Sequence, residues 1–236
     1  MAKILVADSI AQAGIELLAN HHEIISLTGL SENSLIEALE GVQALLVRSQ
    51  TQVTAQVINK STDLEIIGRA GVGVDNIDLD AATQQGVVVV NAPLSNTTST
   101  AEHAFALMLS AARHIPQAHH SLQNGEWARS RYAGLELSGQ VLGVIGLGRI
   151  GSEVARRARA FDMEIIAYDP FITIDRANQL GVQLLDFESL LVKSDFLTLH
   201  TALHDGTRNL LSTQEFKKMK ESAILINAAR GPLIDE

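Results

Sequence analysis

The sequence of 236 residues contains no cysteine. Disulfide bonds, thiolate metal sites and a thiol nucleophile are therefore excluded. A metal site would have to be built from histidine and carboxylate side chains, and we predict none. The apolar runs also fall short of the roughly 18 residues that a membrane-spanning helix requires. Because the amino-terminal stretch, MAKILVADSI, lacks the apolar core and cleavage pattern of a signal peptide, we expect a cytoplasmic protein.

Aromatic residues are scarce, at 4% of the chain, and charged residues reach only 19%. Hydrophobic residues nevertheless make up 46%, which excludes a disordered chain or a collagen-like repeat and indicates a globular protein. The 18 Lys and Arg residues are outnumbered by 27 Asp and Glu residues, so the formal net charge is -9. This charge disfavours nonspecific binding to nucleic acid or to a membrane surface, and an anionic ligand would need a local positive site.

Short runs of Val, Ile and Leu alternate with amphipathic stretches along the chain, a pattern typical of parallel sheets flanked by helices. We therefore predict an α/β protein. The predicted strands cover residues 4–7, 23–27, 42–47, 64–68, 87–90, 141–145, 164–168, 182–185, 196–199 and 223–226. Helical patterns over residues 97–113 and 116–125 interrupt this series, so we predict two domains, residues 1–93 and residues 94–236.

A glycine-rich turn, GLGRIG, spans residues 146–151 between a predicted strand and a predicted helix. This is the setting of the dinucleotide-binding fingerprint. Gly146 permits the tight turn, Gly148 lets the backbone approach a pyrophosphate, and Gly151 lets the helix pack closely on the strand. The first amides of the helix then face the anion. Such turns also occur for packing alone, and the hexapeptide by itself leaves that alternative open.

An acidic residue in the expected place supports the cofactor interpretation. Asp169 ends the next predicted strand, 18 residues after Gly151, where a carboxylate would accept the hydroxyl groups of the NAD ribose. Its charge would repel a 2′-phosphate, so we predict NAD rather than NADP, with Arg149 beside the pyrophosphate. The alternative is an aspartate that forms a turn before Pro170.

Five motifs follow one another along the chain. They are LVRS at residues 46–49, GRAGVGVDNID at residues 68–78, the stretch over residues 91–106, the glycine loop, and NAARGPLIDE at residues 227–236. Together they resemble the D-2-hydroxyacid dehydrogenase family. The resemblance covers essentially the whole chain. It implies two doubly wound parallel-sheet domains, an incomplete flavodoxin-like substrate domain and a Rossmann NAD-binding domain. It also implies NAD-dependent oxidation of a D-2-hydroxy acid, with 3-phosphoglycerate as the expected substrate.

The same resemblance implies roles for single residues. Arg230 is the expected catalytic residue, because the matching arginine of the family binds the substrate carboxylate and polarises the carbonyl. Substrate contacts are expected from Arg48, Ser49, Gly73 and Asn96, and cofactor contacts from Val72, Gly146, Gly148, Arg149, Ile150, Gly151, Asp169, Thr201, Ala228 and Ala229. The alternatives are a surface salt bridge for Arg230, and for Arg48 a position that merely ends a strand in solvent.

The chain departs from the family pattern at its end. The family's histidine and glutamate for proton transfer lie beyond the arginine motif, whereas this sequence stops at Glu236, so we expect a truncated chain. His200 is the tempting substitute base, but its position matches a role in cofactor surroundings or packing. An NAD-binding sensor or corepressor-like module without turnover is therefore the alternative function. The GxGxxG spacing disfavours a methyltransferase.

The helix predicted over residues 97–113 and the arm that carries Trp127 and Tyr132 resemble the region through which family members form homodimers. The arm holds the only tryptophan of a chain poor in aromatic residues, and aromatic anchors concentrate in interfaces. We therefore expect a homodimer formed through the NAD-binding domain. A helix over residues 97–113 that only covers the sheet is the alternative.

Overall fold

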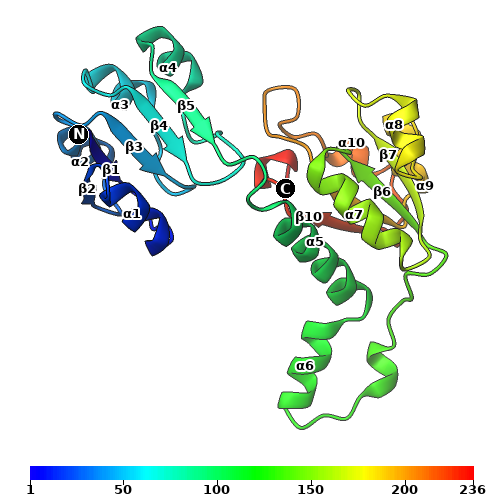
Figure 1. The fold of residues 1–236 in the computed structure, drawn as a ribbon. Helices are drawn as coiled ribbons and strands as arrows, with labels where there is room; N and C mark the ends of the chain where they lie inside the picture. Colours follow the sequence, from blue (N-terminus) through cyan, green and yellow to red (C-terminus); the bar gives the residue numbers. More distant parts are fainter. The chain divides into compact units, whose positions relative to one another are not determined.

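The computed structural model describes residues 1–236 and divides into two compact units, Met1–Asn96 and Thr97–Glu236. We refer to them as unit 1 and unit 2. Each is built around its own parallel sheet with helices beside it, as Figure 1 shows. The predicted α/β class with two parallel sheets is therefore confirmed.

Unit 1 holds a five-stranded sheet in the order β2-β1-β3-β4-β5. Its strands are β1 (Lys3–Val6), β2 (Glu23–Ser26), β3 (Ala44–Val47), β4 (Ile66–Arg69) and β5 (Val88–Asn91). Its helices are α1 (Gln12–Ala19), α2 (Glu32–Ala38), α3 (Ala55–Lys60) and α4 (Leu79–Gln85). This is the flavodoxin-like strand order that the resemblance implies.

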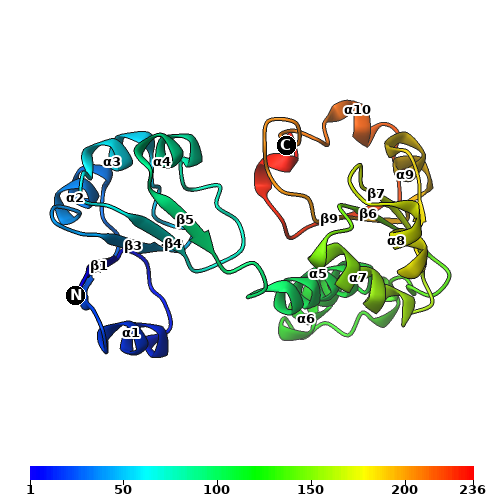
Figure 2. The same cartoon turned by 45° about the horizontal axis from the view of Figure 1, so that its top comes forward.

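One face of this sheet carries the buried core of unit 1. Leu5 and Leu45 project from neighbouring strands into that core, and α2, α3 and α4 cover them. Figure 2 shows these three helices on one side of the sheet and α1 on the other. Each of the three begins at a capping side chain, Ser31, Thr54 or Asp78, which accepts a hydrogen bond from an amide of the first turn.

Unit 2 holds a five-stranded sheet in the order β10-β9-β6-β7-β8. Its strands are β6 (Val141–Ile145), β7 (Glu164–Tyr168), β8 (Gln183–Leu184), β9 (Phe196–Leu199) and β10 (Ile224–Asn227). The chain builds outward from β6 to β8 and then returns to place β9 on the other side of β6. This is the Rossmann order. The carboxyl ends of β6 and β9 form its switch point, where sheets of this kind bind their ligands.

Helices cover both faces of the unit 2 sheet. The helices of unit 2 are α5 (Thr97–Ala112), α6 (Ile115–Gln123), α7 (Arg149–Arg159), α8 (Ile174–Gln179), α9 (Phe187–Lys193), α10 (Thr213–Phe216) and the 3-10 helices η1 (Arg129–Tyr132) and η2 (Gly231–Leu233). Phe105 and Val154 belong to the core between α5, α7 and one face of the sheet, whereas Leu190 and Leu191 of α9 pack on the other face. Figure 2 shows both layers.

A joint at His114 separates α5 from α6. Its φ of 51° is left-handed, which ends the first helix and lets the chain turn before α6 begins at Ile115. In Figure 1, α6 extends away from the sheet of unit 2. None of the helices in the chain combines the length and the apolar character that crossing a membrane would need.

Candidate active site

Glycine shapes the turn between β6 and α7 because the neighbouring backbone leaves no room for a side chain. Gly146 has a φ of 88°, and a Cβ there would lie 2.9 Å from the carbonyl oxygen of His200 and 2.9 Å from the amide nitrogen of Thr201. A Cβ on Gly151 would lie 2.1 Å from the carbonyl oxygen of Gly146. The loop therefore packs against the end of β9, and α7 packs against the loop, at distances that only glycine allows.

Gly148 differs from these two glycines, because no protein atom lies within 4 Å of the place where its Cβ would be. Packing therefore gives no reason for glycine at this position, whereas a ligand that approaches the backbone does. The first amides of α7 have no partner within the helix, and the first turn has no acidic residue. Arg149 is exposed there and Ile150 is half-buried. These features fit the pyrophosphate of a dinucleotide.

The Asp169 carboxylate links the end of β7 to the glycine loop. Its Oδ2 accepts a hydrogen bond from the amide of Leu147 at 2.8 Å, and its Oδ1 accepts one from the amide of Phe171 at 2.9 Å. The second bond belongs to the local turn around Pro170, so the turn-forming role is present as well. The bond from Leu147 holds the Asp169 carboxylate beside the glycine loop, whose amides fit a pyrophosphate. The side chain is only half-buried, so it remains accessible to a ligand.

The loop after β9 meets the glycine loop at His200 and Thr201. The His200 amide donates to the carbonyl oxygen of Ile145 at 2.8 Å, and the His200 Nε2 lies 2.9 Å from the hydroxyl oxygen of the buried Thr198. Burial lowers the pKa of His200 to about 4, because the protonated ring loses its hydration. The imidazole is therefore neutral near pH 7 and too weakly basic to act there as a general base. A packing role, or one in the surroundings of the cofactor, fits better.

The buried ring should make the stability of the fold depend on pH. In the unfolded chain His200 titrates near its ordinary pKa of 6.5, so between pH 6.5 and about 4 the unfolded state binds a proton that the native state does not. This group should lower the free energy of unfolding by about 2 kcal/mol between pH 7 and pH 5. His200→Gln should remove that part of the loss, whereas His204→Gln, an exposed control, should retain it. Urea unfolding at both pH values measures it, and equal losses in wild type and His200→Gln would contradict this account.

Arg230 lies in a turn after β10 that the side chain of Asn227 braces. The Asn227 Nδ2 donates to the carbonyl oxygen of Arg230 at 2.8 Å, and its Oδ1 accepts from the amide of Ala229 at 3.1 Å. Ala228 and Ala229 are half-buried in this turn. The sequence motifs do not single out Asn227, although an asparagine at the start of a turn often bonds to the backbone that follows it.

The predicted residues of unit 2 lie along one edge of its sheet. Gly146, Asp169, Thr201 and Arg230 follow the carboxyl ends of β6, β7, β9 and β10, which are parallel. Neighbouring strands lie about 4.8 Å apart, so the ends of β6 and β10, with β9 between them, are separated by about 10 Å. The predicted cofactor residues of unit 2 and Arg230 therefore share the edge at which sheets of this kind bind their ligands.

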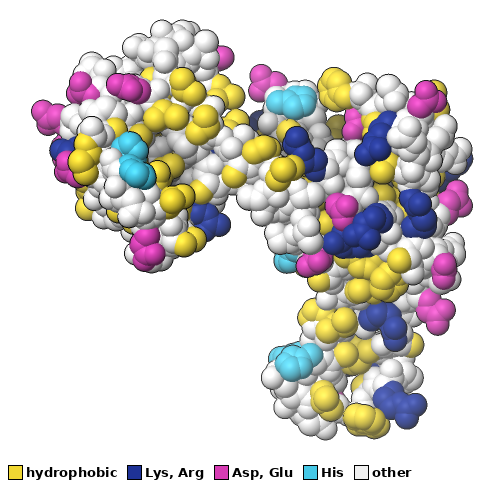
Figure 3. Space-filling model, viewed as in Figure 1, with side chains coloured by type: hydrophobic (Ala, Val, Ile, Leu, Met, Phe, Trp, Pro, Cys, Tyr) yellow, Lys and Arg dark blue, Asp and Glu magenta, His cyan; other side chains and the backbone are white.

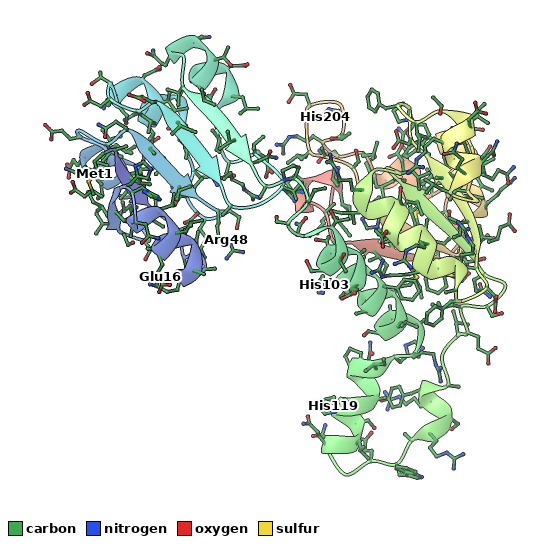
Figure 4. All side chains as sticks on the ribbon, in the orientation of Figure 1. Met1, Glu16, Arg48, His103, His119 and His204 are labelled. Atoms are coloured by element: carbon green, nitrogen blue, oxygen red, sulfur yellow. The ribbon has the colours of Figure 1, made fainter.

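The predicted residues of unit 1 also follow the carboxyl ends of parallel strands. Arg48 and Ser49 come directly after β3 and are exposed, and Figure 4 labels Arg48 at this edge. Val72 and Gly73 lie in the loop after β4, and Asn96 lies after β5; all three are half-buried. The structure thus groups the predicted substrate residues and Val72 in unit 1, and the other predicted cofactor residues with Arg230 in unit 2.

Comparison with known proteins connects these features to relatives. Residues 105–236, all within unit 2, match the family described as D-isomer specific 2-hydroxyacid dehydrogenase, NAD binding domain. The chain is 52% identical, over 99% of its length, to a D-3-phosphoglycerate dehydrogenase from Archaeoglobus fulgidus, of which it covers 45%. It thus spans about half the length of the curated relatives that it matches.

Solved structures share the fold. A crystal structure of a Thermus thermophilus protein matches with a TM-score of 0.91 and 32% identity, over 99% of this chain and 75% of that one. A glyoxylate reductase from Paecilomyes thermophila matches with a TM-score of 0.90 and 30% identity, over 99% of this chain and 75% of that one. Residues 105–236 form an NAD-binding domain, and the chain belongs to the D-isomer specific 2-hydroxyacid dehydrogenase family.

Proposed function

We propose that this protein is an NAD-dependent dehydrogenase that oxidises a D-2-hydroxy acid, 3-phosphoglycerate, to 3-phosphohydroxypyruvate. One observation carries the proposal: the Asp169 carboxylate is bonded to the Leu147 amide of the glycine loop, at the switch point of the sheet in unit 2. Membership of the family supports the reaction class, and relatives at about 50% identity that are named D-3-phosphoglycerate dehydrogenase support the substrate.

In this proposal residues 94–236 make most of the cofactor contacts and act on the reacting carbon. The amides that follow Gly148 bind the pyrophosphate, and Asp169 accepts hydrogen bonds from the ribose hydroxyls. NAD, when bound, supplies the hydride acceptor. The Arg230 guanidinium binds the substrate carboxylate through two hydrogen bonds and stabilises negative charge on the oxygen of the reacting carbon. Further cofactor contacts come from Val72, Gly146, Arg149, Ile150, Gly151, Thr201, Ala228 and Ala229.

The proposed substrate residues of unit 1 supply a local cation on an acidic protein. Arg48 binds a phosphate or carboxylate group of the substrate, and Ser49 and Asn96 add hydrogen bonds from their side chains. The amide of Gly73 faces the anion as well. These residues would make a phosphorylated hydroxy acid a better ligand than its unphosphorylated counterpart.

Titration of the purified chain with the two nicotinamide cofactors tests the cofactor assignment. We expect NADH to bind about tenfold more tightly than NADPH, a difference of about 1.4 kcal/mol, because Asp169 repels the 2′-phosphate. Asp169→Ser should narrow this difference, whereas Asp175→Ser, which removes an exposed acid of α8, should preserve it. The fluorescence of the bound cofactor reports both constants. Tighter binding of NADPH by the wild-type chain would refute the assignment.

A second candidate, an NAD-binding sensor without turnover, is favoured by the low basicity of His200. Its pKa of about 4 excludes it as a base near pH 7, so the hydroxyl proton that oxidation releases would have to pass to solvent or to another acceptor. A spectrophotometric assay of NADH formation with a panel of 2-hydroxy acids separates the two functions. Turnover supports the dehydrogenase, and NADH binding without turnover supports the sensor.

We further propose that the chain forms a homodimer through unit 2. Trp127 is 76% exposed, and Leu122 and Ile115 are 57% and 50% exposed. Figure 3 shows hydrophobic side chains gathered along the part of unit 2 that contains α6. An exposed apolar surface of this kind is typical of a protein interface. Sedimentation velocity should show a dimer that Trp127→Ala weakens, and a wild-type monomer at high concentration would argue against it.

A further inference from the structure

A buried polar network lies beneath the loop over residues 48–51. Asp8, Thr51 and Asn76 are 2%, 8% and 7% exposed, whereas Arg48 and Ser49 are exposed. None of the three buried residues is among the predicted site residues. We propose that they are positioning residues, which hold the loop so that Arg48 and Ser49 meet an anionic substrate. This inference rests on the function proposed above for Arg48 and Ser49.

The Asp8 carboxylate accepts three hydrogen bonds from this loop. Its Oδ2 accepts from the amide of Arg48 at 2.6 Å and from the amide of Thr51 at 3.3 Å, and its Oδ1 accepts from the Thr51 hydroxyl at 2.8 Å. The Thr51 hydroxyl also lies 3.3 Å from the carbonyl oxygen of Ala7. Asparagine has only one acceptor atom in its side chain, so at position 8 it could not accept from both the backbone amides and this hydroxyl. Burying a carboxylate is unfavourable in itself. The loop geometry that the charge fixes explains why an acid is found here.

Asn76 holds the same loop by donating hydrogen bonds to its backbone carbonyl groups. Its Nδ2 donates to the carbonyl oxygen of Arg48 at 2.8 Å and to that of Thr51 at 2.7 Å. Both hydrogens of the amide group are thereby used. Its Oδ1 is buried and accepts no hydrogen bond from the protein.

Together the two side chains bond the N–H and the C=O of both Arg48 and Thr51. The backbone at the two ends of the loop is therefore fixed, while the side chains of Arg48 and Ser49 point toward solvent from a rigid support. A loop that is ordered before the ligand arrives loses less conformational entropy on binding. Loss of the network should therefore weaken substrate binding and leave the cofactor site of unit 2 unaffected.

Binding measurements on the whole chain, saturated with NADH so that no oxidation occurs, test this role. We expect Asp8→Asn and Thr51→Val to raise the dissociation constant for 3-phosphoglycerate, measured by calorimetry, about tenfold. Thr51→Ser keeps the hydroxyl and should restore wild-type affinity. All three variants should bind NADH as the wild type does.

Ser61→Ala is the matched control, because it removes another buried hydroxyl of unit 1, one that donates to the carbonyl oxygen of Val57 at 2.8 Å. It should bind 3-phosphoglycerate like the wild type. Wild-type affinity in both Asp8→Asn and Thr51→Val would overturn the positioning role. An equal loss in Ser61→Ala would also overturn it, since the effect would then be general destabilisation.

Failure of the proposed function can be told apart from failure of the positioning role. A wild-type chain that binds NADH but not 3-phosphoglycerate would contradict the proposed substrate. Hydrogen exchange of the Arg48 and Thr51 amides then tests the network directly, because both amides donate to Asp8. Exchange that is at least several-fold faster in Asp8→Asn supports the positioning role, and unchanged exchange overturns it.

Discussion

Replacing Gly148 with alanine should raise the dissociation constant for NADH about 100-fold and change the unfolding temperature little. A Cβ at this position would meet no protein atom within 4 Å, and the φ of -71° suits any residue, so the fold tolerates the change. The same Cβ would occupy the space through which the backbone approaches a pyrophosphate. Losing about 3 kcal/mol of hydrogen bonding to phosphate corresponds to that factor. Fluorescence titration with NADH and thermal unfolding measure the two effects.

Gly151→Ala is the matched variant, and its primary effect should be on stability. Its Cβ would lie 2.1 Å from the carbonyl oxygen of Gly146, so α7 must move away from the loop. We expect the free energy of unfolding to fall by about 2 kcal/mol, with loss of NADH binding as a consequence. If Gly148→Ala unfolds as readily as Gly151→Ala, or binds NADH as the wild type does, then packing rather than a pyrophosphate explains the glycine at 148.

Arg230→Ala should lower the turnover of 3-phosphoglycerate about 1,000-fold, and Arg230→Lys about 100-fold. Lysine keeps the positive charge but cannot form the two parallel hydrogen bonds that a guanidinium makes with a carboxylate. Because the glycine loop and Asp169 are unaltered, both variants should bind NADH as the wild type does. Initial rates of NADH formation and a parallel NADH titration check both statements.

Arg176→Lys provides the control for this substitution, since Arg176 is an exposed arginine of α8 in the same unit. It should leave turnover unchanged. Normal turnover in Arg230→Lys would mean that residue 230 contributes no more than a point charge, and normal turnover in Arg230→Ala would remove it from the proposed mechanism.

The strands were predictable from the sequence because the strands of parallel sheets have continuous apolar runs. All ten lie within two residues of their predicted ends, and β6, β7 and β9 match at both ends. The order of the strands within each sheet could not be predicted in this way. Periodicity carries no information about which strands are neighbours, so the order 2-1-3-4-5 of unit 1 and the Rossmann order of unit 2 were expected only from the resemblance to a family.

The candidate site, too, could be predicted only in part. The motifs located Gly146, Asp169 and Arg230 at the ends of strands, and the parallel topology brings those ends to one edge. The hydrogen bonds between distant segments were not predictable. Asp8 and Arg48 are 40 residues apart in sequence and meet only because β1 and β3 are neighbours in the sheet. The low pKa of His200 also depends on burial, which the spacing of residues does not reveal.

The division of the chain into two units, each with its own buried core, has a thermodynamic consequence. A ligand held by native unit 2 adds its binding free energy to the unfolding of that unit. At a concentration 100 times the dissociation constant the addition is about 2.7 kcal/mol. Cofactor uptake would then make unit 2 more resistant to heat and to proteases.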